Sequence, residues 1–299
     1  MIFKGLYDEK SSTFKFFIFL SLVFLSAVLH ILFALVVVYF FVDGGPDLIK
    51  YQDLNSQVSI NYLKFLQLFT AIGMFIMPVV LYSYLTNFNL NWNKTNRHAI
   101  FLVVAIILLV APLVSFLLEL NSLIEFPSWI LQFDNNSEIL IQAFLKMPTI
   151  FDLAFNLLVI AIIPAVGEEL FFRGYLQQVL KNKFGSIHIT ILITATIFSI
   201  FHLDFQGLVP RVFLGILLGY FFFWTKSLWV PIVAHFINNA LAVFLTYLYP
   251  SGNIELEKIG YSINNSEPIN YNAVMFSILA VSILMYLLYK SQKYAKSKI

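Results

Sequence analysis

Cysteine is absent from the 299 residues, and charged residues are scarce. The missing thiol excludes disulfides, thiolate metal sites and a cysteine nucleophile, and it leaves the redox compartment open. Only 11% of the residues are charged, whereas a soluble domain averages roughly a quarter. The formal net charge of +2 offers no basic face to a nucleic acid. We therefore expect neither a soluble domain nor a nucleic-acid partner.

Apolar residues are correspondingly abundant. Of all residues, 60% are hydrophobic and 17% are aromatic, and the mean hydropathy is +0.85. A membrane-spanning helix needs about 20 consecutive apolar residues. The stretches that reach or approach this length are 14–42, 62–85, 98–118, 151–180, 187–203, 208–224, 228–249 and 271–289. The sequence predicts an all-α polytopic protein with about eight transmembrane helices, embedded in the lipid bilayer of the cell (plasma or inner) membrane.

Positive charge alternates along these stretches, and cytoplasmic loops carry an excess of lysine and arginine. With the N-terminus inside, the cytoplasmic segments hold thirteen of these residues. The opposite side holds four, Lys50, Lys146, Arg211 and Lys258. We therefore predict that both termini are cytoplasmic.

The chain is interpreted as a single transmembrane domain over 1–299. Residues 1–148 hold three accessory helices and an outside loop, whose segment 121–138 is expected to lie along the membrane interface as an amphipathic helix. Residues 149–249 hold nearly all the buried polar groups and form the predicted catalytic core. Residues 250–299 hold an outside loop, the last helix and a basic cytoplasmic tail.

The run G-E-E-L-F-F-R-G-Y at 167–175 places Glu168, Glu169 and Arg173 inside an apolar stretch. One charged side chain at the bilayer centre costs ~2.5–3.5 kcal/mol on insertion scales, so three together require a function or mutual pairing. Glu169 and Arg173 are four residues apart and share one helical face, where they can pair. Glu168 has no such local partner and is the stronger functional candidate.

Two histidines occur in the later spans with helical companions. His202 follows Phe198 by four residues in the fifth span, and His235 precedes Asn239 by four in the seventh. If the fourth span continues to about residue 181, Glu168 lies ~20 Å and His202 ~22 Å from the cytoplasmic ends of their helices. The prediction is a long fourth helix and a polar site inside the membrane, among spans four, five and seven.

These residue types allow two mechanisms of peptide hydrolysis. A glutamate and a histidine beside one water can act as general base and acid, while a second histidine and an amide stabilise an oxyanion. Alternatively, Glu168, His202 and His235 can be three ligands of a catalytic zinc. The residues alone leave both open, so the expected cofactor is one zinc ion or none. The sequence contains no H-E-x-x-H, G-x-S-x-G, G-x-G-D or phosphate-binding loop.

The ordered set E-E-x-x-x-R, F-x-x-x-H and H-x-x-x-N resembles the CPBP intramembrane proteases, also called CAAX proteases and bacteriocin-processing or Abi-domain proteins. The resemblance covers 151–249. It implies that Glu168 and His202 activate water, that His235 and Asn239 form the oxyanion hole, and that Glu169, Arg173 and Phe198 support the site.

By this resemblance the protein is an endopeptidase, with or without a metal, acting on a prenylated, lipidated or membrane-embedded peptide or protein. Two other functions stay open: a non-catalytic bacteriocin immunity or scaffold protein that binds a partner in the same pocket, and a proton-coupled transporter. The polar groups are predicted to cluster at one depth in the membrane. A transporter needs a path of polar groups across the membrane, so the sequence disfavours transport.

Overall fold

The computed structural model describes residues 3–51, 53–249 and 269–296, without the side chains of 133–136 and 294–296. Over these residues the chain is helical and has no named β-strand, with one isolated bridge between Trp92 and Ser227. The all-α prediction is confirmed. Most of the loop expected after the seventh span, 250–268, lies outside the described residues.

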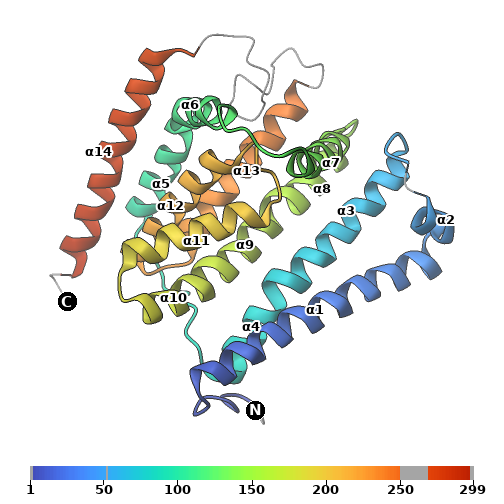
Figure 1. Ribbon diagram of the computed structural model, residues 1–299, viewed down its shortest axis with the longest axis horizontal. Coiled ribbons are helices and arrows are strands. Elements are labelled where there is room, and N and C mark those ends of the chain that lie inside the picture. Colours follow the sequence, from blue (N-terminus) through green and yellow to red (C-terminus); the bar gives the residue numbers. More distant parts are fainter. Residues whose placement is uncertain (1–2, 52, 250–268, 297–299) are drawn as a thin grey trace.

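The first half of the chain forms seven α-helices and one π-helical segment (Figure 1). These are α1 (Ser12–Phe41), α2 (Gly45–Lys50), α3 (Gln57–Ala71), η1 (Ile72–Ile76), α4 (Met77–Thr86), α5 (Arg97–Leu109), α6 (Ala111–Ser122) and α7 (Ser128–Phe144). The second half contains α8 (Ile150–Asn156), η2 (Leu157–Ile162), α9 (Ile163–Glu169), η3 (Leu170–Leu176), α10 (Gln177–Phe184), α11 (Ile187–Phe201), α12 (Leu208–Thr225), α13 (Trp229–Leu248) and α14 (Tyr271–Lys296).

Six helices in the described part of the chain are long and apolar enough to cross a membrane. A seventh span results if α5 and α6 count as one, although they bend by 47°. The bend falls beside Pro112 in the first turn of α6, where the missing N–H interrupts the hydrogen-bond ladder. α11 has only 15 residues and falls short of a full span. The predicted count of eight is therefore not confirmed.

The fourth span is one long helix, Ile150–Phe184, built from α8, η2, α9, η3 and α10 without a break. Thr149 and Asp152 form a capping box at its start. It ends at Gly185, whose φ of 71° is a conformation that glycine adopts without strain. The prediction that this helix continues well past Gly167 is confirmed. We call Ile150–Phe184 the long helix.

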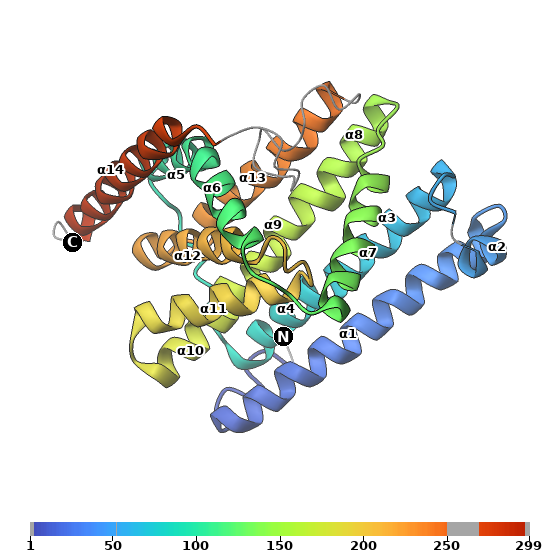
Figure 2. The same ribbon diagram turned by 45° about the horizontal axis from the view of Figure 1, so that its top comes forward.

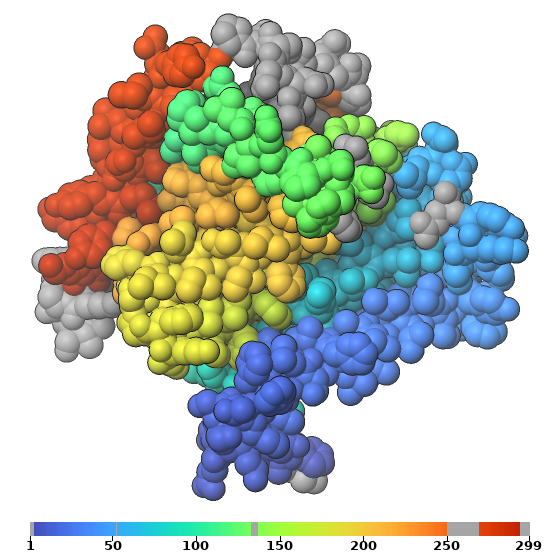
Figure 3. Space-filling view, viewed as in Figure 1, coloured from blue at the N-terminus to red at the C-terminus, as the bar shows by residue number. Residues whose placement is uncertain are grey.

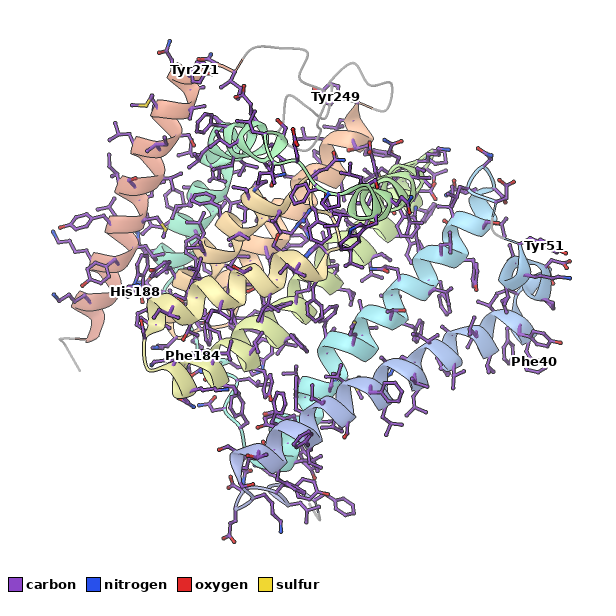
Figure 4. The ribbon with its side chains drawn as sticks, in the orientation of Figure 1. Phe40, Tyr51, Phe184, His188, Tyr249 and Tyr271 are labelled. Carbon is purple, nitrogen blue, oxygen red and sulfur yellow. The ribbon has the colours of Figure 1, made fainter. Side chains whose placement is uncertain are left out.

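Helices α11, α12 and α13 pack around the long helix (Figure 2). The α11–α12 contact is close, because a Cβ built on Gly215 would lie 3.0 Å from the Cβ of Ala195. α13 runs antiparallel to the long helix: His235 bonds to Glu169, and Asn239, one turn later, bonds to Ile160, nine residues earlier. The turn between α10 and α11 lies between Phe184 and His188 (Figure 4).

The N-terminal helices α1, α3 and α4 form a wall on one side of the long helix, and α14 lies at the opposite edge of the molecule (Figure 3). Phe19 of α1 stacks on Tyr175 with ring centroids 3.6 Å apart. Beside the acidic pair, a Cβ built on Gly167 would lie 3.0 Å from the Cβ of Phe75. Glycine therefore lets the wall approach the long helix at this level.

The expected amphipathic segment 121–138 is divided in the structure. Its first residues complete α6, and the interfacial candidate is α7, which begins at Ser128. Trp129, Ile139 and Ile141 on α7 are exposed. Pro127 separates the two helices, since the residue before a proline disfavours helical backbone.

Candidate active site

One carboxylate oxygen faces two histidines from different helices. Glu168 Oε2, on α9, lies 3.8 Å from Nε2 of His202 and 3.9 Å from Nε2 of His235. Glu168 and His235 are 13% and 6% exposed in their side chains, and His202 is 33% exposed. The carboxylate oxygen is buried and has no hydrogen-bond partner in the protein. The predicted match in depth between Glu168 and His202 is confirmed.

The second glutamate bridges an arginine and a histidine. Oε1 of Glu169 accepts a 2.6 Å bond from Arg173 and lies 2.9 Å from Nδ1 of His235. All three side chains are buried, Glu169 completely. The expected ion pair within the helix is present, and it also contacts the catalytic candidate on α13. Glu169 therefore fixes the orientation of the His235 ring.

Arg173 is held by three groups. Besides the carboxylate, its guanidinium donates to the carbonyl oxygen of Gly215 on α12 at 3.0 Å and lies 4.9 Å from the ring centroid of Phe198. A flat guanidinium stacks well on an aromatic face. The structure thus brings Phe198 into contact with the predicted supporting residues.

The hydrogen bonds at Nδ1 decide which nitrogen of each histidine faces Glu168. Nδ1 of His202 is 2.9 Å from the carbonyl oxygen of Phe198, which can only accept. Nδ1 of His202 therefore carries the proton, and in the neutral ring Nε2 presents a lone pair to Glu168. Nδ1 of His235 likewise faces an acceptor, the carboxylate of Glu169. Both Nε2 atoms are thereby directed at one point.

Asn239 lies one turn beyond His235, but its hydrogen bonds lead elsewhere. Nδ2 donates to the carbonyl oxygen of Ile160 at 3.1 Å, and Oδ1 accepts from Asn238. That carbonyl lies in the π-helical segment η2, four residues before Pro164, which has no N–H to donate. One of the two Nδ2 hydrogens of Asn239 is committed to this bond, and the other is left for a ligand.

The predicted zinc ligands come together without forming a recognisable ligand set. Within the described residues no group of three His, Cys, Asp or Glu side chains has a geometry that could hold a metal ion. The zinc alternative stays a prediction for direct measurement.

Sequence reasoning missed the residues of α12 that complete the site. Gln177 and Arg173 are four residues apart and donate to the carbonyl oxygens of Gly219 and Gly215, which are also four apart. The signal was G-x-x-x-G at 215–219, a pattern that lets helices approach closely in membranes. Without a side chain on either glycine, long polar side chains can reach the α12 backbone.

Fold and site together define the class: an all-helical integral membrane protein with a glutamate–histidine cluster among three helices. The segment 150–241, which contains Glu168, His202, His235 and Asn239, matches the family model described as type II CAAX prenyl endopeptidase Rce1-like. The resemblance predicted from the three motifs is confirmed over this segment.

Two curated bacterial proteins are similar to part of the chain. YdiL of Bacillus subtilis (strain 168), described as a candidate membrane peptidase, is 30% identical over 89 residues, which are 30% of this chain and 36% of the relative. The membrane-embedded CAAX protease MroQ of Staphylococcus aureus (strain USA300) is 31% identical over 96 residues, 30% of this chain and 39% of the relative. The chain thus matches less than half the length of either relative. No solved structure matches at a comparable level.

Proposed function

We propose that the protein is an intramembrane endopeptidase that hydrolyses a peptide bond with a water activated by Glu168 and His202. The observation that carries this proposal is the buried Oε2 of Glu168, which faces two histidine Nε2 atoms and has no hydrogen-bond partner. An unpartnered buried carboxylate oxygen is costly unless a ligand or water completes it. A hydrolytic water is the ligand that this chemistry requires.

The distances leave room for that water. An oxygen placed to one side of the line between Glu168 Oε2 and His202 Nε2 can lie about 2.8 Å from both, since the two atoms are 3.8 Å apart. Both atoms act as acceptors, so they orient the two water hydrogens and leave an oxygen lone pair free for attack. This is the arrangement of general-base catalysis.

The reaction then follows in two steps. The water oxygen bonds to the scissile carbonyl carbon while Glu168 takes the proton, and the carbonyl electrons move to the oxygen. On collapse of the tetrahedral intermediate the C–N bond breaks, and the proton passes from Glu168 to the leaving amine. The second water hydrogen stays on the new carboxyl group, so the products are a carboxylic acid and an amine, and no covalent enzyme intermediate is formed.

His235 serves as the oxyanion donor in its protonated form. Nδ1–H of the imidazolium donates to Glu169 at 2.9 Å. Nε2–H is then free for the developing oxyanion, and the remaining Nδ2 hydrogen of Asn239 is the second donor.

Two observations support the proposed substrate class: the apolar surroundings of the site and the similarity to a CAAX protease. A peptide reaching Glu168 must enter an apolar helix bundle, which favours a prenylated, otherwise lipidated or membrane-embedded segment. The lipid or apolar part of such a substrate dissolves in the bilayer and thereby holds the attached peptide bond at the depth of the site.

The test uses purified protein in detergent and a fluorogenic farnesylated peptide. Glu168→Gln keeps the shape but removes the base and should abolish cleavage. Glu125→Gln, at an exposed position on the loop before α7, is the matched control and should cleave like the wild type. Full activity of Glu168→Gln would overturn the proposal.

The same preparation decides the cofactor. Metal analysis is paired with activity after dialysis against a chelator. Activity that survives with less than stoichiometric metal supports the metal-free mechanism. Stoichiometric zinc that is lost together with activity would replace it with the zinc alternative.

A further inference from the structure

The turn that follows His202 has a backbone conformation that its sequence does not favour. α11 ends at Phe201, and Leu203 has a φ of 51°, in the left-handed region. A leucine rarely adopts this region, because its Cβ then crowds the carbonyl oxygen. Such a conformation persists only where the surroundings impose it, and these positions cluster at functional sites.

A buried asparagine from outside the matched segment holds this turn. Asn121, near the end of α6 and 1% exposed, donates from Nδ2 to the carbonyl oxygen of Phe205 at 3.0 Å. Its Oδ1 accepts from the backbone N–H of Val209 at 2.8 Å. One side chain therefore fixes both ends of the segment 205–209, which joins the turn to α12.

Local contacts close the turn on its other side. Arg211 pairs with the side chain of Asp204 and donates to its carbonyl oxygen. Ser199 of α11 donates to the carbonyl oxygen of Leu208 at 3.0 Å. These bonds lie within 199–211, whereas the bonds of Asn121 come from α6, a helix distant in the sequence.

We infer that Asn121 is a positioning residue for His202: by holding 205–209 it maintains the left-handed turn at Leu203 that ends α11 at the histidine. Without it, Leu203 can relax toward helical backbone and the His202 ring moves away from Glu168. This inference rests on the proposed function of His202, and it gives α6 a role in the site.

The first test compares Asn121→Leu, which keeps the approximate size, with the wild type on the farnesylated peptide. We expect kcat to fall by about tenfold to a hundredfold with little change in KM, because a catalytic group displaced by about 1 Å costs rates of this order. Asn93→Leu is the matched control: Asn93 also bonds a distant loop carbonyl, that of Lys226, and the variant should keep kcat within twofold.

The decisive variant adds Leu203→Gly to Asn121→Leu. Glycine adopts positive φ without strain, so the turn can persist without the asparagine and most of the lost kcat should return. A loss of kcat that Leu203→Gly does not recover would overturn the inference, since Asn121 would then act on the fold as a whole.

A measurement independent of proteolysis follows the His202 ring itself. Diethyl pyrocarbonate modification, read by mass spectrometry, should be several-fold faster at His202 in Asn121→Leu, with exposed His98 as the internal reference. An unchanged rate would overturn the inference. Failure of the wild type to cleave the peptide would count against the proposed function alone, because the labelling experiment still tests the turn.

Discussion

Asn239 of α13 donates to the carbonyl oxygen of Ile160 at 3.1 Å, in the π-helical segment η2 that directly precedes the turn with Pro164. Proline at position 164 removes the amide hydrogen that an α-helix would supply there. Asn239, which is predicted for the oxyanion hole, is thus also the hydrogen-bond partner of the π-helical segment η2. The asparagine gains a fixed orientation from the bond.

Replacement of Asn239 by alanine is expected to reduce stability by about 1–3 kcal/mol, because the Ile160 carbonyl loses its donor. The loss should be smaller in a Pro164→Ala background, where residue 164 regains an N–H. A double-mutant cycle in unfolding experiments with mixed micelles measures this coupling. Equal losses in both backgrounds would show that the proline does not create the acceptor.

Arg173→Met should be more destabilising alone than together with Glu169→Gln. The single variant leaves a fully buried carboxylate without the arginine of its ion pair, and breaking a buried pair in this way typically costs about 3–5 kcal/mol. In the double variant the glutamine oxygen still accepts from Nδ1 of His235 and carries no charge. Thermal unfolding in detergent ranks the proteins, and a double variant less stable than Arg173→Met would contradict the interpretation.

Lys64→Met is expected to leave the protein as stable as the wild type, or more stable by about 1 kcal/mol or more. Lys64 on α3 is completely buried, and its Nζ has no hydrogen-bond partner in the structure. The ammonium lies 5.8 Å from the ring centroid of Phe144. An apolar side chain of similar length avoids the desolvation of the charge. A clear loss of stability would mean that the attraction between Lys64 and Asp152 outweighs the desolvation of the charge.

The topology can be tested by labelling, because the chain has no cysteine of its own. Single cysteines at Lys94 and Lys146, both exposed, are predicted to lie on opposite sides of the membrane. A membrane-impermeant maleimide added to intact cells should modify only Lys146→Cys. Modification of Lys94→Cys alone would invert the predicted orientation, which places both termini in the cytoplasm.

Much of the fold follows from the sequence, because long apolar runs have few stable forms in a membrane. The same physical constraint placed Glu168 and His202 together: two charged or polar groups in neighbouring helices must meet at one depth to satisfy each other. The sequence did not indicate backbone details, such as the left-handed conformation of Leu203 that follows α11. Lys64 was missed as well, because the apolar residues around it dominate the mean hydropathy of its segment.

The partners of the predicted groups were also beyond the sequence. The spacing of Glu169 and Arg173 indicated their pairing, but the contact of the same carboxylate oxygen with His235 depends on how α13 rotates against the long helix. Spacing placed Asn239 on the His235 face, and could not show that its amide is bound to Ile160. Side-chain rotamers and helix rotation set these contacts, and neither has a periodic signal.

The seven-residue α9, which ends in the two glutamates, lies between the π-helical segments η2 and η3. A π-bulge behaves like a single residue inserted into an α-helix, and each residue turns the chain by about 100°. The angular phase of α9 is therefore set separately from that of α8 and α10. Removing one residue from either bulge would rotate one end of the long helix against the glutamates by more than a quarter turn. Indels here should be far less tolerated than substitutions, and the length of this stretch is as much a part of the site as its side chains.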